Sequence, residues 1–87
     1  MSTFKLTIST PDGNKFEGEA TRLFVRGCEG DLAILAGHIP FATAVTKCTM
    51  RIDLPDGSSK SADTDSGILT VGDDKVILLT AGIGELS

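Results

Sequence analysis

Turn-forming residues interrupt this chain at short intervals along its whole length. Glycine, proline, asparagine and aspartate mark residues 11–14, 18, 27, 30, 37, 40, 55–57, 67, 72–74 and 82. The runs between them hold roughly four to eight residues and are rich in Val, Ile, Leu, Thr and Phe, which is typical of strands joined by tight turns. The spacing therefore favours a fold made of short strands and gives no confident helix.

Alternation within the runs supports strands. Phe4, Leu6 and Ile8 alternate with polar residues, as they do in a strand with one buried face. Residues 50–54 repeat the pattern. They belong to the one long window without breakers, residues 41–54, whose density of β-branched side chains lowers helix propensity. We expect strands in both places.

The last runs predict a hairpin. Residues 72–75 form a turn between the runs 68–71 and 76–79. Residues 76–79 are apolar on both faces, which predicts a central strand that is covered on each side. Together the runs predict an all-β fold, a small β-sandwich or flattened barrel of about nine or ten short, mostly antiparallel strands.

Length and charge limit the possible functions. The 87 residues, 40% of them hydrophobic, suffice for one core, so we expect a single β domain over residues 1–87. The net charge of -4 is a poor match for nucleic acid or anionic lipid. No apolar run reaches the roughly 18 residues of a membrane span, and the N-terminus lacks the pattern of a signal peptide. We expect no nucleic-acid partner and no direct insertion into a membrane.

Candidate catalytic and metal-binding groups are few. His38 is the single histidine, and its neighbours Gly37 and Pro40 form a turn without a nucleophile. Cys28 and Cys48 are too few for a metal knuckle, and we interpret them as reduced, half-buried small hydrophobes. The sequence leaves open whether a single disulfide joins them. We expect no catalytic residue and no metal ligand among these groups.

The acidic pairs have plainer explanations. Asp73 and Asp74 fit a tight turn, and Asp63 and Asp65 lie in a stretch that resembles an exposed strand edge. Neither pair has the spacing of a calcium loop, and no glycine cluster stands between a strand and a helix to bind a nucleotide. We therefore expect no cofactor and no enzymatic activity.

Residues 18–41 carry the most specific pattern. A strand over 20–26, a turn over 27–30 and a strand over 31–36 are followed by a second turn over 37–40. Gly27, Gly30 and Gly37 suit positions with positive φ, and Pro40 ends the pairing. Leu23, Val25, Leu32 and Ile34 form the expected inward set, while Glu29 and Asp31 make an exposed acidic tip.

These features together resemble the N-terminal β-sandwich domain of the epsilon subunit of F-type ATP synthases. The resemblance rests first on the opening strand over residues 4–11 and on the Phe-Glu-Gly segment over 16–18. It rests next on the series Val-x-Gly-x-x-Gly-x-x-x-Ile-x-x-Gly-His-x-Pro over 25–40. The closing hairpin over 67–79 completes it, so that the resemblance covers essentially the whole chain.

The resemblance implies a non-catalytic component of the central stalk, or rotor. In the family this sandwich joins the gamma subunit to the polar loops of the membrane c-ring and helps couple proton or sodium ion transport to ATP synthesis. It implies a peripheral location on the cytoplasmic face of the bacterial plasma membrane, as part of the ATP synthase complex.

The resemblance also assigns residues by position. Glu29, Gly30 and Asp31 would face the c-ring, and His38 would lie towards gamma and the ring. Polar loops with basic residues would complement an acidic tip, which sets register more than affinity.

Phe24 adds a candidate from the residues themselves. It stands on the outward face of its strand between Arg22 and Arg26. Aromatic and arginine side chains are enriched in binding hot spots, so this trio is a candidate gamma contact. The alternative is a ring that lies under arginine stems or under a second layer.

The sequence also departs from the family. Most members continue into a pair of C-terminal helices, which these 87 residues do not include. We therefore expect neither the helical brake on ATP hydrolysis nor the ATP binding that this hairpin gives to some members. The rival hypothesis is a free-standing protein-interaction module built on the same sandwich. Four phenylalanines without Tyr or Trp make an aromatic platform hard to assemble.

Overall fold

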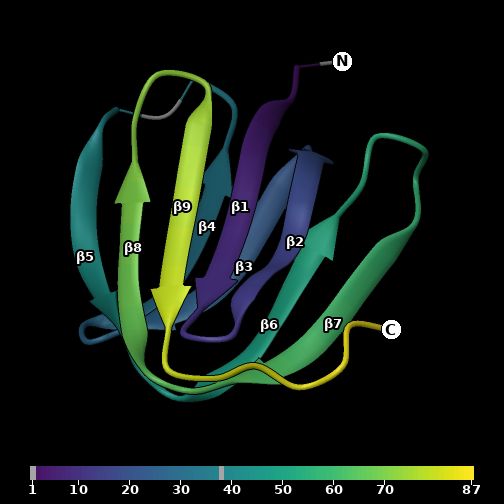
Figure 1. Cartoon of the computed structure of the whole chain (residues 1–87). Coiled ribbons are helices and arrows are strands. Elements are labelled where there is room, and N and C mark those ends of the chain that lie inside the picture. The colour runs from purple at the N-terminus through teal and green to yellow at the C-terminus, as the bar shows by residue number, and fades with distance from the viewer. Residues whose placement is uncertain (1, 38) are drawn as a thin grey trace.

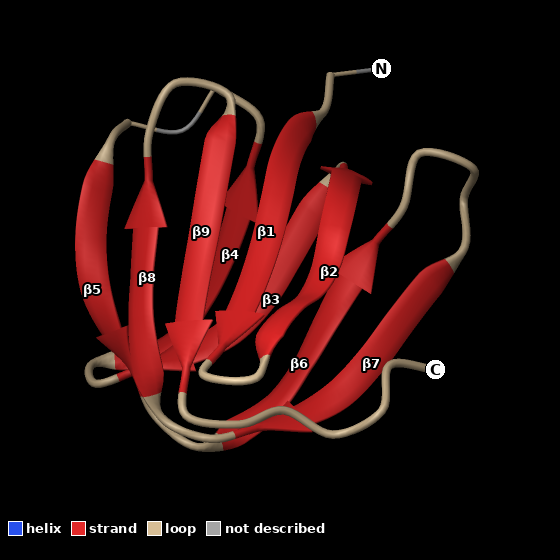
Figure 2. Ribbon diagram, in the orientation of Figure 1, coloured by secondary structure: helices blue, strands red, loops and turns tan. Residues whose placement is uncertain are grey.

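A computed structural model describes residues 2–37 and 39–87, which form nine strands and no helix (Figures 1 and 2). The all-β prediction is confirmed: the sequence predicts about nine or ten strands, and the described residues form nine. In the described part of the chain, nothing is long, helical and apolar enough to span a membrane. The strands are β1 (Phe4–Thr10), β2 (Gly13–Ala20), β3 (Arg22–Gly27), β4 (Gly30–Leu35), β5 (Phe41–Val45), β6 (Cys48–Asp53), β7 (Ser59–Thr64), β8 (Gly67–Val71) and β9 (Lys75–Thr80).

The strands form one sheet that curls over itself. Its order is β2-β1-β9-β8-β5-β3-β6-β7, and β4 pairs with β3. Figure 1 shows β2, β1, β9, β8 and β5 as one layer and β4, β3, β6 and β7 as the other. All neighbours are antiparallel except β1 and β9, which are parallel, as the mostly antiparallel prediction allows.

The sheet turns the corner between β5 and β6. The sequence shows residues 41–54 as one uninterrupted strand-forming window, but the structure breaks it at residues 46–47. Val45 is the partner of Gly27, whereas Arg51 is the partner of Phe24, so the register on β3 shifts between the two segments. The N–H and the hydroxyl of Thr46 both donate to the Arg26 carbonyl, at 2.9 and 3.3 Å. Side-chain and backbone bonds to β3 therefore hold a bend that no glycine or proline marks.

The core lies between the two layers and follows the predicted alternation. Phe4, Leu6 and Ile8 are buried, as predicted. The inward set of β3 and β4 is confirmed except that Leu32 is only half-buried. The buried hydrophobic side chains are Phe4, Leu6, Ile8, Ala20, Leu23, Val25, Ile34, Val45, Met50, Ile52, Ala62, Leu69, Val71, Val76 and Leu78.

One prediction for β9 is wrong. The sequence indicated a strand covered on both sides over residues 76–79, and the structure covers only one side. Val76 and Leu78 are buried, but Ile77 and Leu79 are exposed. The described chain places β9 in the middle of one layer, with the core on its inner face and no further layer of its own on the outer face.

The C-terminal segment covers the edge of β7. Ser61 and Ser87 exchange two backbone hydrogen bonds, and the Gly84 N–H donates to the Asp63 carbonyl. The carboxylates of Asp63 and Asp65 are exposed, but the backbone edge that the sequence suggested is not free. In Figure 1 the yellow C-terminal segment runs alongside the β7–β8 connection and ends beside β7. This segment therefore closes an edge that could otherwise pair with another chain.

Candidate partner-binding surfaces

The β3–β4 hairpin ends in the predicted acidic tip. Gly27 and Gly30 are partners at the end of the pairing, and Cys28 and Glu29 form the turn. Glu29, Gly30 and Asp31 are all exposed. Gly30 has φ 128°, as glycine allows. The tip has the shape and charge that the sequence predicted.

The prediction of a positive φ is wrong for Gly27. Its φ is not among the positive values; it is buried, and an added Cβ would lie 3.0 Å from Leu32 Cδ1 and 3.5 Å from the Ala44 carbonyl oxygen. Close packing, and not backbone conformation, therefore disfavours a side chain here, because the Leu32 methyl group would have to shift. Gly37 does have a positive φ of 80°, and Pro40 is exposed immediately before β5. His38 lies outside the described residues.

An ion pair joins the tip to β3. Arg26 Nε lies 3.0 Å from Asp31 Oδ1, and the two side chains are 62% and 81% exposed. The hydrogen bond and the charge of Asp31 raise the pKa of the Arg26 guanidinium above its ordinary value. Because water surrounds both side chains, the pair adds little to stability, and a partner can replace it at little cost. The structure thus brings together one residue predicted for the c-ring and one predicted for gamma.

The Phe24 ring is covered by an arginine, but not by either of its neighbours on β3. Arg51, its partner on β6, places its guanidinium carbon 4.4 Å from the ring centroid. Arg51 Nε also donates to Asp53 Oδ1 at 3.1 Å, and Arg22 Nε lies 3.9 Å from Asp53 Oδ2. Phe24 is half-buried. The ring is therefore covered on one side by the Arg51 guanidinium, an arginine of β6 and not one of β3.

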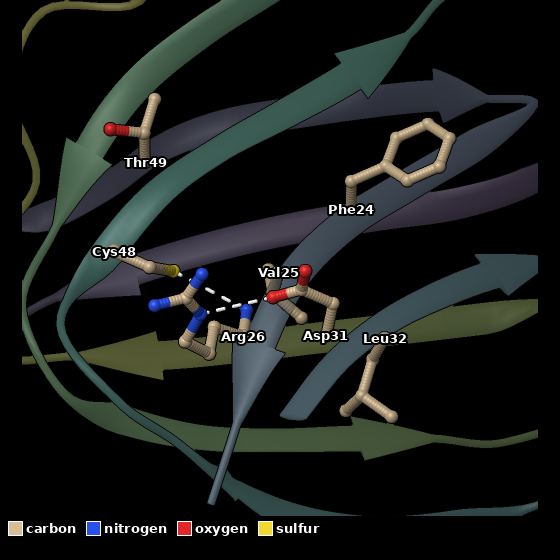
Figure 3. Close-up of a pocket in the computed structure, with 7 residues that line it drawn as sticks. All are labelled: Phe24, Val25, Arg26, Asp31, Leu32, Cys48 and Thr49. Atoms are coloured by element: carbon tan, nitrogen blue, oxygen red, sulfur yellow. Dashed lines mark hydrogen bonds and ion pairs between the residues drawn. The ribbon is translucent and has the colours of Figure 1, made fainter. Parts of the chain in front are cut away.

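A hollow of about 440 Å³ opens between β3, β4 and β6 (Figure 3). Within it the Arg26 side chain is paired with Asp31, and the Arg26 backbone N–H donates to Cys48 Sγ at 3.4 Å. The Cys48 thiol therefore accepts a hydrogen bond, and the Arg26 guanidinium is paired with the Asp31 carboxylate. The residues that line the hollow are Phe24, Val25, Arg26, Asp31, Leu32, Cys48 and Thr49. This set suits a polar protein contact better than the activation of a nucleophile.

Cys28 and Cys48 are both free, and they differ in burial. Cys48 is half-buried as predicted, but Cys28 is exposed because it stands in the β3–β4 turn. Across residues 2–37 and 39–87, no three His, Cys, Asp or Glu side chains come together as a metal-binding group.

The sequence reasoning missed the outer face of β8 and β9. Ile68, Ile77 and Leu79 are 55%, 40% and 53% exposed. The signal that could have found them is the loss of alternation over residues 76–79, because apolar side chains on both faces mean either two covering layers or one exposed apolar face.

Comparisons with known proteins identify the family. Residues 3–84 match the family described as ATP synthase, Delta/Epsilon chain, beta-sandwich domain. The ATP synthase epsilon chain of Chlorobium limicola is 36% identical over 80 residues, which are 92% of this chain and 91% of that relative. The epsilon chain of Clostridium perfringens is 37% identical over 76 residues, but these span only 57% of its length.

The fold recurs in a solved structure. A chain of the mitochondrial ATP synthase of Euglena gracilis superposes with a TM-score of 0.90 at 19% identity, over 97% of this chain and 54% of that one. This likeness confirms the sandwich fold. With the match over residues 3–84, the chain belongs to the family of ATP synthase delta/epsilon chain β-sandwich domains.

Proposed function

We propose that this chain is a non-catalytic component of the central stalk of an F-type ATP synthase. In this role it joins the gamma subunit to the c-ring and helps couple ion translocation to ATP synthesis, from the cytoplasmic face of a bacterial plasma membrane. The observation that carries the proposal is the match over nearly the whole chain to a relative named ATP synthase epsilon chain, of which 91% is covered.

The acidic tip is the proposed contact with the c-ring. Glu29 and Asp31 are exposed beside Gly30 at one end of the sandwich. Carboxylates at such a tip complement basic side chains on polar loops and fix the orientation of the contact. The Arg26–Asp31 pair supports this role, because an exposed ion pair can exchange Arg26 for a partner cation.

The β3 face is a proposed contact with gamma, through Arg22, Phe24 and Arg26. For His38, the resemblance implies a position towards gamma and the ring. If the Phe24 ring is a hot spot, the substitution Phe24→Ala weakens gamma binding by about tenfold, which corresponds to about 1.4 kcal/mol. Lys15→Ala, at an exposed residue of β2 in the other layer, is the control and should leave the affinity within twofold. Gamma binding by Phe24→Ala within about 0.5 kcal/mol of the wild type would remove Phe24 from the interface.

The function is tested by isolating the complex that contains the chain. A tagged full chain, expressed in its own host at native level, should co-purify from detergent-solubilised membranes with gamma, the c-ring and the F1 subunits. A chain that carries Glu29→Lys and Asp31→Lys should retain gamma and lose the c-ring more readily as salt rises. Recovery of the wild-type chain alone, at low salt, would favour the free-standing interaction module and would contradict the stalk function.

A further inference from the structure

Asp12 and Gly13 lie at the turn between β1 and β2. Pro11 and Asp12 form the turn, and Thr10 and Gly13 on either side of it are the last pair of the two strands. Asp12 and Gly13 are exposed, and Gly13 has φ 123°. Apart from its chain neighbours, no atom of the described residues lies within 4 Å of a Cβ built on Gly13. The dipeptide therefore stands in open space.

An aspartate that precedes a glycine can undergo a reaction with its own backbone. The glycine amide nitrogen attacks the side-chain carboxyl carbon in its neutral form, one water leaves, and a five-membered succinimide forms. Glycine permits this ring closure because no Cβ restricts its backbone. Water that adds back at the side-chain carbonyl restores aspartate, and water that adds at the backbone carbonyl gives isoaspartate. The sequence of steps needs no oxidant and no cofactor.

The tripeptide Pro-Asp-Gly occurs twice in this sequence, at residues 11–13 and 55–57, so the two sites can be compared directly. Asp56 and Gly57 are also exposed, Gly57 has φ 90°, and a Cβ built on it would meet equally open space. The sites differ in what holds the aspartate. Asp56 Oδ1 accepts the Ser58 N–H at 2.9 Å and the Ser58 hydroxyl at 2.5 Å. The Gly57 N–H donates to the Leu54 carbonyl at 3.1 Å.

These bonds oppose the reaction at Asp56 in two ways. The Ser58 hydroxyl, followed by the Ser58 N–H, lowers the pKa of the Asp56 carboxyl, so the neutral form that reacts is scarcer. The carboxylate and the Gly57 nitrogen are also held by other partners, and these bonds must break before the ring can close.

Asp12 has no such restraint. Its backbone N–H donates to Thr10 Oγ1 at 3.2 Å, but among residues 2–37 and 39–87 nothing donates to its carboxylate. That carboxylate is therefore free to turn towards the Gly13 nitrogen.

We propose that Asp12–Gly13 is a site of spontaneous aspartate isomerisation in the folded chain, whereas the bonds from Ser58 protect Asp56–Gly57. In the product the main chain runs through the former side chain of Asp12, so the turn gains one carbon atom. The carboxylate that remains free is then the α-carboxylate, which stands at a different place in the turn.

The site shares an end of the sandwich with the acidic tip at residues 29–31. Paired residues cross the sheet from the β3–β4 turn to the β1–β2 turn: Gly27, Val45, Gly67 and Thr80, with Ser9 opposite Leu79. Figure 1 shows both turns at the same end of the molecule. Isomerisation therefore changes the backbone and the position of a charge at the end of the sandwich that carries the tip.

Ageing of the purified full chain at mildly acidic pH tests the proposal. A protease that cleaves before aspartate but not before isoaspartate, followed by mass spectrometry with electron-transfer fragmentation, locates and counts the product. Isoaspartate should form at Asp12 about tenfold faster than at Asp56, the order expected when a hydrogen bond to a charged group must first break. Synthetic peptides over residues 8–16 and 52–60, which lack the fold, should isomerise at similar rates.

Three variants of the full chain separate the causes. Asp12→Glu should show no isomerised product at this position, because its longer side chain cannot form the five-membered ring. Asp12→Asn should give isoaspartate faster than the wild type, since it reaches the same succinimide with loss of ammonia. Ser58→Ala should raise the rate at Asp56 towards that at Asp12. Thermal melting confirms that each exposed substitution leaves the domain folded.

Three results would overturn the proposal. Isomerisation in the peptide over residues 8–16 but not at Asp12 of the full chain would show that the fold protects this turn. Equal rates at Asp12 and Asp56 in the full chain would show that the bonds from Ser58 give no protection. An Asp56 that stays as slow in Ser58→Ala as in the wild type would assign the protection to another cause.

Discussion

Two buried threonine hydroxyls hold the β7–β8 corner to the C-terminal segment, and their removal should destabilise the domain measurably. Thr64 and Thr80 are 1% and 5% exposed, and their hydroxyl oxygens lie 3.1 Å apart. Thr80 Oγ1 is also 3.0 Å from the Asp65 carbonyl and 3.1 Å from the Gly82 carbonyl. The substitution Thr80→Val keeps the shape of the side chain and removes one buried hydroxyl from this network. The Gly82 carbonyl keeps the Asp65 N–H, and Thr64 Oγ1 lies 3.2 Å from the Asp65 carbonyl.

The expected cost follows from the lost hydrogen bonds. A buried hydrogen bond contributes about 0.5–1.5 kcal/mol net, and each kcal/mol lowers the Tm of a domain of this size by about 4–8 °C. Thr80→Val should therefore melt about 2–12 °C below the wild type by circular dichroism. Thr64→Val should behave similarly. The double variant should cost less than the sum of the two, because each hydroxyl serves the other.

The control is a threonine with the same shape on the surface. Thr70 is exposed on β8, so Thr70→Val should change the free energy of unfolding by no more than about 0.5 kcal/mol. If Thr80→Val melted within 2 °C of Thr70→Val, the hydroxyl network would not stabilise this corner. Strict additivity in the double variant would show that the two hydroxyls act independently.

Two further substitutions have clear expected outcomes. Gly67→Ala should lower the free energy of unfolding, measured by urea denaturation, by about 1–3 kcal/mol or more. The added Cβ would collide with the Leu79 carbonyl oxygen and lie 2.9 Å from Thr80 Cα. Gly84→Ala, whose nearest atom is at 3.6 Å, is its control, and equal costs would refute the collision. Ser58→Ala should raise the pKa of Asp56 in an NMR titration, because the Ser58 hydroxyl and N–H now lower that pKa. A carboxylate whose pKa is lowered on folding stabilises the folded domain at pH values above its unfolded pKa, and this stabilisation is lost as the pH falls through the folded pKa. The free energy of unfolding of Ser58→Ala should therefore depend less steeply on pH on the acid side. An unchanged Asp56 pKa would contradict the assignment.

Alternation and turn residues predicted most of the fold because both are local. The buried side of β1 is set by Phe4, Leu6 and Ile8, and the turns at residues 55–57 and 72–75 use residues that suit tight geometry. The break at residues 46–47 was not predictable in this way. It depends on Thr46 and the Arg26 carbonyl, which lie 20 residues apart and meet where β3 and β5 pair. Contacts between distant segments leave no local pattern.

For the candidate site, the sequence predicted the acidic tip but not the residue that covers Phe24. The acidic tip follows from glycines around Glu29, and the structure shows it exposed. The partner of Phe24 did not follow, since Arg51 reaches the ring from a strand that is distant in sequence. Outward position can be read from alternation along one strand, but the neighbour that covers a side chain depends on cross-strand register.

For residues 76–79, the number of layers that cover the strand differs between the chain alone and the chain in a complex. Apolar side chains on both faces of β9 indicated two covering layers, and the described chain supplies one, over Val76 and Leu78. Leaving Ile77 and Leu79 in water forgoes the burial of both side chains, at roughly 25 cal/mol for each Å² of apolar surface. A monomer gains nothing from that arrangement, whereas a subunit recovers the free energy when a partner docks.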